Sequence, residues 1–315
     1  MTADIHNQAF PTPFIVGPTA VGKTATAIEL ARLVGGEIIS IDSRQVYRGM
    51  DVGTAKPTLQ QLAEIRHHMI DVLDPTEQIS AGMYREMVLP MVAEIRERAH
   101  LPIFVGGSGM YVKALVEGIF SESETDETVR RKIRRELEKK GAAELYNRLV
   151  DIDPETAIKT HINDVKRITR ALEIYEITGE APSRHYRRQQ SEPPFPYRIF
   201  VLYMEREKLY ERIDRRVEEM LEEGLVEEVK GLLDSGLRND LDALLTLGYQ
   251  EVIVYLDGNC SLAEMIENVK RNTRRYAKRQ LTWFRNQLQA DWIDMEKVQH
   301  ITDVARAIAD QLSQH

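Results

Sequence analysis

The residues with the clearest chemical potential form a short segment near the start of the chain, made of Gly17, Pro18, Thr19, Ala20, Val21, Gly22, Lys23 and Thr24. Their spacing matches the phosphate-binding pattern G-x-x-x-x-G-K-[ST], in which glycines let backbone N–H groups converge on phosphate oxygens. Lys23 would neutralise the charge of the terminal phosphate, and the Thr24 hydroxyl would bind Mg²⁺. The segment predicts a site for a diphosphate or triphosphate, with a glycine-rich turn that binds nothing as the alternative.

A second polar segment, which contains Asp42, Ser43, Arg44 and Gln45, follows the apolar run 37–41. A carboxylate at the end of a strand can hold Mg²⁺ or accept a proton from a substrate, and Asp42 is the candidate for either role. The alternative for Asp42 is a cap of the local turn. Arg44 and Gln45 carry hydrogen-bonding groups that match the edges of nucleobases.

The chain has no clear machinery for hydrolysing a nucleotide. An ATPase of this kind needs an acidic residue at the end of a buried strand to organise Mg²⁺ and water. The most apolar strand candidate, 101–105, is followed instead by Gly106-Gly107-Ser108-Gly109, and Asp71 in the run 68–72 is a weak substitute. This combination fits a diphosphate leaving group better than the turnover of ATP.

Arg212 and Arg216 form a further candidate, because residues four apart share one face of a helix. Two neighbouring guanidinium groups suit a diphosphate or an RNA backbone. Ion pairs with Glu211, Glu218 and Glu219 are equally compatible with this spacing.

These residues need a scaffold, and the first 120 residues alternate between strand and helix patterns. We expect strands at 14–16, 37–41, 68–72 and 101–105, and helices at 24–34, 58–66, 81–99 and 110–117. Strands separated by helices predict a parallel sheet with helices on both faces. Ligands of such sheets bind beyond the carboxyl ends of the strands, so the three polar or glycine-rich segments would line one crevice.

The pattern changes at about Ser121, where a charged stretch without strand signals begins. We expect an all-α insertion over residues 121–194 and a catalytic core over residues 1–120 and 195–315. In the second part of the core, the sequence predicts a strand at 198–204 and helices at 207–234, 261–289 and 301–313. The helix at 261 opens with the capping box Ser261-x-x-Glu264.

Charge is distributed unevenly along the chain. The net charge is −8, yet the segment from Arg130 to Arg188 has 15 Lys and Arg against 10 Asp and Glu, and residues 271–285 carry six basic and no acidic residues. Local basic surfaces favour binding to phosphate backbones, although a solvated helix face is the alternative for each stretch. Trp283 and Phe284 interleave with the second stretch and could stack on bases or pack in the core.

Composition excludes several classes of protein. The single cysteine, Cys260, cannot form an internal disulfide or a cysteine-based metal cluster. No apolar run approaches the roughly 18 residues that span a bilayer. The first residues lack the basic and apolar regions of a secretion signal, so we expect a cytoplasmic protein without a membrane partner.

These motifs, taken in order, resemble those of the bacterial tRNA dimethylallyltransferases, also called tRNA isopentenyltransferases. The segments that carry the resemblance are 17–24, 42–57, 67–75, 106–111, 164–173, 212–229, 248–251 and 276–285. Two positions depart from the family pattern. Val21 replaces a serine and removes one side-chain donor, whereas Ser108 replaces a threonine and keeps the hydroxyl.

The resemblance implies an activity and a set of site residues. The family moves a dimethylallyl group from dimethylallyl diphosphate to N6 of the adenine at position 37, beside the tRNA anticodon. It implies a P-loop NTPase-like α/β core, Mg²⁺ bound with Thr24, and Thr19, Lys23, Asp42 and Arg216 as the catalytic set, with Thr19 and Arg216 on the diphosphate. We expect the anticodon stem-loop as partner of a monomer, contacted by Asp42, Ser43, Arg44, Gln45, Ser108, Arg130, Lys166, Arg167, Ile168, Thr169 and Arg170.

Two other classes of protein stay open from the residues alone. A small-molecule P-loop kinase shares the first strand–loop–helix unit and the acidic residue after the second strand, but it needs no basic helical insertion. An RNA-binding protein gated by a nucleotide needs no carboxylate in the crevice.

Overall fold

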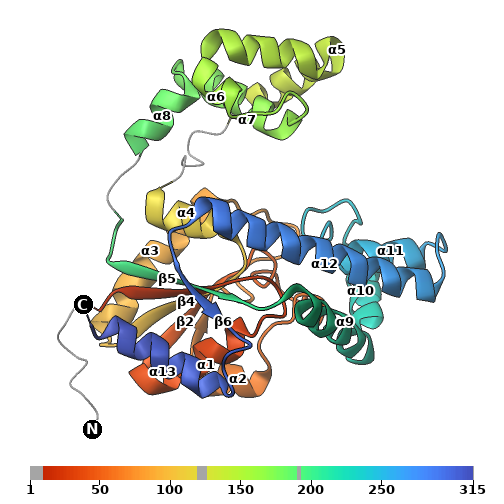
Figure 1. Cartoon of the computed structure of the whole chain (residues 1–315). Helices are drawn as coiled ribbons and strands as arrows, with labels where there is room; N and C mark the ends of the chain where they lie inside the picture. Colours follow the sequence, from red (N-terminus) through yellow and green to blue (C-terminus); the bar gives the residue numbers. More distant parts are fainter. Residues whose placement is uncertain (1–9, 119–125, 190–192, 315) are drawn as a thin grey trace. The chain divides into compact units, whose positions relative to one another are not determined.

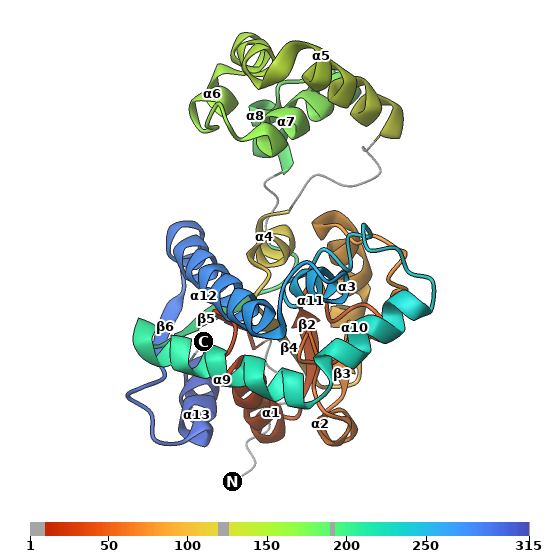
Figure 2. The same ribbon diagram turned by 90° about the vertical axis from the view of Figure 1, so that its right-hand side faces the viewer.

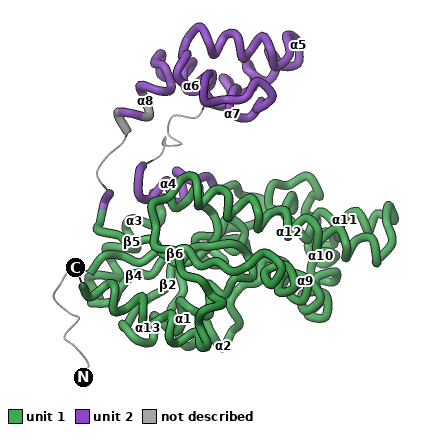
Figure 3. Tube along the Cα trace, in the orientation of Figure 1, with its two compact units in different colours: residues 1–79, 87–112, 195–315 green, residues 80–86, 113–194 purple. Residues whose placement is uncertain are grey.

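The computed structural model describes residues 10–118, 126–189 and 193–314 (Figure 1). The chain forms two compact units (Figure 3). Unit 1 consists of Met1–Ile79, Met87–Val112 and Phe195–His315, and unit 2 consists of Ser80–Glu86 and Lys113–Pro194. Each unit is described separately below.

Unit 1 is built on a parallel sheet of six strands in the order β3-β2-β4-β1-β5-β6. The strands are β1 (Thr12–Val16), β2 (Gly36–Ile41), β3 (His67–His68), β4 (Leu101–Gly106), β5 (Tyr197–Tyr203) and β6 (Asp291–Asp294). Strands β1, β2 and β4 are buried along their whole length. Their nearly continuous apolar sequences reflect a sheet that is covered on both faces.

Helices cover both faces of this sheet. In Figures 1 and 2, α1 (Lys23–Val34) and α13 (Ile301–Leu312) lie on one side of the sheet, and α12 (Leu262–Gln287) lies on the other. The remaining helices assigned wholly or partly to unit 1 are α2 (Leu59–Glu64), α3 (Ala81–Glu97), α4 (Gly109–Glu117), α9 (Arg206–Glu222), α10 (Leu225–Asp234) and α11 (Tyr249–Leu256). The predicted α/β class with a parallel sheet and flanking helices is therefore confirmed.

Unit 2 contains four further helices, α5 (Glu127–Ile152), α6 (Pro154–Ile158), α7 (Val165–Thr178) and α8 (Pro182–Gln189). The described residues of this unit include no strand. Buried side chains from α5, α6 and α7, such as Ile133, Leu149 and Leu172, form its own hydrophobic core. The segment between β4 and β5 that belongs to unit 2 is therefore α-helical where it is described.

Three details differ from the predicted elements. The helix expected at 207–234 is two helices, because Gly224 adopts the left-handed conformation with φ of 95° between α9 and α10. The strand expected at 68–72 ends at His68, since Met69 and Asp71 have positive φ angles of 62° and 56°. Helix α11 and the edge strand β6 were not predicted.

Among the described residues, no helix has both the length and the apolar character needed to cross a membrane.

Candidate active site

The glycine-rich segment forms a loop between β1 and α1, as its pattern predicts. Gly22, with φ of 109°, precedes the first residue of α1, which is Lys23. The loop runs close to β5, because a Cβ atom on Gly17 would lie 2.5 Å from the Leu202 carbonyl oxygen. The Lys23 ammonium donates a hydrogen bond to the Pro18 carbonyl oxygen at 2.7 Å, so the loop closes around its own lysine.

Unit 1 contains a cavity of about 100 Å³ that joins this loop to three other segments. Its walls include Thr19, Lys23 and Thr24 from the loop and α1, Asp42 and Gln45 from the segment after β2, and Arg216 from α9. Gly106 and Gly107 at the end of β4 complete the same wall. The crevice expected at the carboxyl ends of the strands is thus present and contains the four residues predicted as catalytic.

The charges in the cavity favour an anion. Burial, together with the nearby Arg216 guanidinium, lowers the pKa of Lys23 to about 7, although the charge of Asp42 opposes both effects. Burial also lowers the pKa of Arg216, again opposed by Asp42. No described carboxylate pairs with Lys23 or Arg216 within 4.0 Å. A bound diphosphate would supply the missing negative charge and restore the protonated state of Lys23.

Arg212 extends this cationic surface into a neighbouring groove of about 890 Å³, which Lys23, Thr24 and Arg216 also line. The Arg212 guanidinium would lie 3.7 Å from a Cβ atom on Gly22, at the start of α1. Arg212 and Arg216 therefore share one face of α9 and both reach the phosphate-binding loop. The alternative for these arginines, ion pairs with Glu211, Glu218 and Glu219, is not found within 4.0 Å among the described residues, and Glu218 pairs with Lys270.

Asp42 performs the predicted turn-capping role and still retains a free oxygen. Its Oδ1 accepts hydrogen bonds from the backbone N–H groups of Arg44 at 2.8 Å and Gln45 at 3.4 Å. No described residue donates a hydrogen bond to its Oδ2. One carboxylate oxygen thus fixes the loop, and the other is available to accept a proton in the cavity.

The segment after Asp42 is held in place by several protein partners. The backbone N–H of Ser43 donates to Ser108 Oγ at 3.3 Å. The Gln45 amide bonds to the Ser40 hydroxyl and donates to two carbonyl oxygens of residues 54 and 55. Arg44 forms an ion pair with Asp242 at 3.1 Å. Base recognition by Arg44 or Gln45 would therefore exchange these contacts for contacts with RNA.

Sequence analysis missed two cavity residues on α12 and one on β3. Tyr276 and Gln280 are four residues apart and both line the cavity, as does His67. Burial, followed by the charge of Asp42, raises the pKa of Tyr276 to about 12, so the phenol stays protonated. The available signal was a tyrosine and a glutamine on one face of a helix otherwise rich in Lys and Arg, and the basic residues dominated the interpretation.

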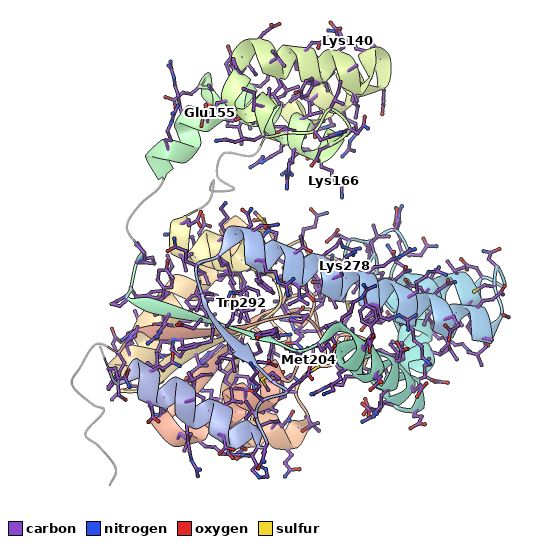
Figure 4. All side chains as sticks on the ribbon, in the orientation of Figure 1. Lys140, Glu155, Lys166, Met204, Lys278 and Trp292 are labelled. Atoms are coloured by element: carbon purple, nitrogen blue, oxygen red, sulfur yellow. The ribbon has the colours of Figure 1, made fainter. Side chains whose placement is uncertain are left out.

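The second basic stretch lies on α12, where some of its basic residues form ion pairs with carboxylates and others do not. Arg274 donates to both carboxylate oxygens of Asp214 at 2.6 Å. Arg275, Arg279 and Lys278, the last labelled in Figure 4, are exposed and form no ion pair with any described residue.

Trp283 and Phe284 have packing roles. A Cβ atom on Gly109 would lie 2.3 Å from the Trp283 ring, and Phe284 is fully buried. These contacts favour the core interpretation of the two aromatic residues over base stacking.

Within unit 2, the predicted tRNA-binding residues differ in exposure. Lys166, labelled in Figure 4, and Arg167 are exposed on α7. Arg130 and Arg170 both contact the Glu173 carboxylate, at 3.7 and 3.1 Å.

The two uncharged residues of this segment serve the structure of α7 itself. Ile168 is only 1% exposed in the core of unit 2, and the Thr169 hydroxyl donates to the Val165 carbonyl oxygen. Their side chains support the helix rather than face a ligand.

Comparison with known proteins identifies the family. The family model described as IPP transferase matches residues 45–287, which is most of the chain. The chain belongs to this family. It is 44% identical over 306 residues to the tRNA dimethylallyltransferase of Halalkalibacterium halodurans, covering 95% of this chain and 97% of that protein. It is 43% identical to the tRNA dimethylallyltransferase of Bacillus subtilis, covering 92% and 93% of the two chains.

Solved structures of the family have the same fold. The crystal structure of the full-length tRNA isopentenylpyrophosphate transferase from Bacillus halodurans matches with a TM-score of 0.71 at 43% identity, covering 96% of this chain and 97% of that one. A eukaryotic dimethylallyltransferase acting on tRNA matches with a TM-score of 0.85 at 30% identity, covering 97% and 80%.

The oxygen atoms that line the cavity fit a Mg²⁺ ion that binds the protein through few ligands. Thr24 and Asp42 each contribute an oxygen to the cavity wall. The described residues contain no group of three or more His, Cys, Asp or Glu side chains that could hold a metal by themselves. Mg²⁺ in phosphate-transfer sites is commonly bound through one or two protein oxygens together with substrate phosphates and water, and Thr24 and Asp42 would supply the protein oxygens of such a site.

Proposed function

We propose that this protein transfers the dimethylallyl group of dimethylallyl diphosphate to N6 of adenosine 37 in tRNA, giving N6-isopentenyladenosine and diphosphate. The observation that carries the proposal is the meeting of Lys23 and Arg216 with Asp42 in one cavity of unit 1. Family membership supports the same reaction and favours it over a small-molecule kinase.

The chemistry requires one bond to form and one to break. N6 of the adenine attacks C1 of the dimethylallyl group, and the bond between C1 and the diphosphate oxygen breaks with its electron pair on the leaving group. Lys23, Arg216 and the backbone N–H groups of the loop stabilise the charge that develops on the diphosphate. Mg²⁺, held by Thr24 with the phosphates, would add to this charge stabilisation.

Asp42 accepts the proton that N6 loses during the attack. Its Oδ2 is suited to this role because Oδ1 is already held by the N–H groups of Arg44 and Gln45. A carboxylate whose orientation is fixed in this way acts as a general base without first having to reorganise. Thr19, on the same wall, contacts the diphosphate.

The tRNA substrate must present an unstacked adenine. A base in a loop costs less to extrude than a base in a duplex, which favours a position beside the anticodon. We assign contacts with the tRNA to Ser43, Arg44, Gln45 and Ser108 near the cavity. We assign contacts with its phosphate backbone to the exposed cations Arg275, Lys278 and Arg279 of α12 and to Arg130, Lys166, Arg167 and Arg170 of unit 2. We further propose that the protein acts as a monomer in the cytoplasm.

The test is incubation of the protein with dimethylallyl diphosphate, Mg²⁺ and unmodified tRNA, followed by mass analysis of the nucleosides. We expect one isopentenylated adenosine per tRNA, located at position 37, and release of an equal amount of diphosphate. A tRNA with guanosine at position 37 is the matched control and should gain nothing. Transfer of the γ-phosphoryl group of ATP to a small acceptor, with formation of ADP and without isoprenylation, would overturn the proposal in favour of a kinase.

A further inference from the structure

Gln280 of α12 bridges two loops of the cavity. Its Oε1 accepts a hydrogen bond from the backbone N–H of Thr19 at 3.0 Å, and its Nε2 donates one to the Gly107 carbonyl oxygen at 3.0 Å. The residue is only 7% exposed. Both ends of the buried amide are thus satisfied, by backbone groups that lie 261 and 173 residues away in the sequence.

The space for this bridge is provided by a glycine. A Cβ atom on Gly107 would lie 2.2 Å from Gln280 Nε2, which is too close for any side chain to fit beside the amide. Gly107 is not among the described residues with positive φ, so no left-handed backbone requires a glycine at this position. The glycine is therefore needed for the contact with Gln280 and not for the conformation of the chain.

The bridge connects the diphosphate side of the cavity to the side of the proposed base. Thr19 belongs to the phosphate-binding loop. Gly107 and Ser108 both donate backbone hydrogen bonds to the Ile41 carbonyl oxygen at 3.2 Å, and Ser108 Oγ accepts from the N–H of Ser43. Asp42 lies between Ile41 and Ser43, so these three hydrogen bonds hold its two direct neighbours in the chain.

We propose that Gln280 is a positioning residue for group transfer, which fixes the distance between the phosphate-binding loop and Asp42. This inference rests on the proposed transfer reaction and adds a residue to it. Joining an N–H to a carbonyl oxygen requires both an acceptor and a donor, and the glutamine amide supplies them on two separate atoms of one planar, uncharged group. Fixing two loops in this way aligns C1 of the donor with N6 of the acceptor.

Two single variants and their combination test this role. Gln280→Ala removes the amide, and Gly107→Ala pushes the amide away while leaving Gln280 in the sequence. Because misalignment by about 1 Å can cost about 10²-fold in rate, we expect each variant to slow single-turnover transfer at saturating substrates by about 10- to 100-fold. The KM for dimethylallyl diphosphate and the Kd for tRNA should change by less than about threefold, because the variants remove alignment and not binding.

The double variant separates positioning from general damage. Both changes break the same contact, so the double variant should be no slower than the slower single variant. Gln287→Ala, at an exposed position of the same helix, is the matched control and should keep the wild-type rate. Thermal unfolding of all variants, measured alongside, establishes that each is folded at the assay temperature.

Three results would overturn the inference. These are a wild-type rate in Gln280→Ala, a defect in either single variant that saturating substrate restores, and single-variant effects that multiply in the double variant. Failure of the proposed function gives a different result, because the wild-type protein itself would then form no isopentenyladenosine.

Discussion

The cavity of unit 1 and the helical insertion of unit 2 use their basic residues in different ways. In unit 1, Lys23, Arg212 and Arg216 line a cavity or groove, and no described carboxylate forms an ion pair with them. In unit 2, the cations of the helical insertion are mostly paired, as for Arg148 with Glu136 and Glu176. Unpaired and partly desolvated cations need an anion, whereas paired surface cations contribute little beyond the local field.

This contrast explains why a count of charges did not locate the site. The insertion segment carries the positive balance, yet Lys23 and Arg216, whose pKa values are lowered by burial, lie in unit 1. An excess of Lys and Arg indicates an electrostatic attraction for a nucleic acid. A lysine without a carboxylate partner, in a cavity that also contains a proposed general base, indicates a catalytic site.

The largest effect is expected at Asp42, which lines the cavity beside Lys23 and Arg216. Asp42→Asn keeps the shape and the Oδ1 acceptor of the turn cap but removes the base, so transfer should slow by roughly 10²–10⁴-fold. Single-turnover rates with prebound tRNA measure this, and tRNA affinity should stay unchanged. A variant with wild-type rates would show that another group takes the proton from N6.

The next effect concerns the unpaired cation itself. Lys23→Ala should lower transfer by roughly 10²–10³-fold, through weaker diphosphate binding and poorer stabilisation of the leaving group. Lys132, paired with Glu176 at 2.6 Å in unit 2, provides the matched control. Lys132→Ala should leave diphosphate affinity, measured by calorimetry, at the wild-type value. Equal losses in both variants would remove the distinction between paired and unpaired lysines.

The low pKa of Lys23 predicts a dependence on pH. Burial holds this pKa at about 7 in the free protein, so the ammonium loses its proton as the pH rises through 7. The protonated form binds the diphosphate, and affinity should therefore be highest below pH 7 and should fall above it. Binding should also take up a proton between pH 7 and pH 8, because the bound anion raises the pKa.

Lys23→Arg provides the control for this dependence, since arginine stays charged across the range. The difference between wild type and variant removes the titration of the diphosphate itself. Calorimetry in buffers of different ionisation enthalpy measures the proton uptake. Identical pH profiles for the two proteins would contradict a titrating lysine.

The parts of the site that were predictable from sequence are the local ones. The phosphate-binding loop and Asp42 follow directly after strands, so short patterns were sufficient to find them. Gln280 was not predictable, because its two partners lie far away in the sequence and its neighbours on α12 are charged.

Glu228 illustrates the same limit on the fold. Its carboxylate accepts hydrogen bonds from the backbone N–H groups of Asp51, Val52 and Gly53 and from the Tyr249 hydroxyl. This contact holds residues 51–53, which precede the cavity-lining residues 54 and 55, yet in the sequence Glu228 looks like one surface acid among many. Gly224 was equally ambiguous, because a glycine inside a helical pattern can either be tolerated or end the helix.

The smallest effect is expected from substitution of the exposed cations of unit 2. Lys166 and Arg167 are exposed on α7, and Arg167 lies 3.4 Å from Asp164, a surface contact that a phosphate could replace. Each contact between a cation and a phosphate releases condensed counterions, so the double variant Lys166→Ala/Arg167→Ala should weaken tRNA binding several-fold at low salt. The slope of log affinity against log salt should become shallower by about 1.4 to 1.8, for two contacts. Transfer at saturating tRNA should keep its rate, because neither residue belongs to the cavity.

The matched control, Lys132→Ala, removes a paired lysine from the same unit and should leave the slope unchanged. If both variants shift the slope equally, the tRNA senses the total charge of the insertion and the pairing of individual cations does not matter.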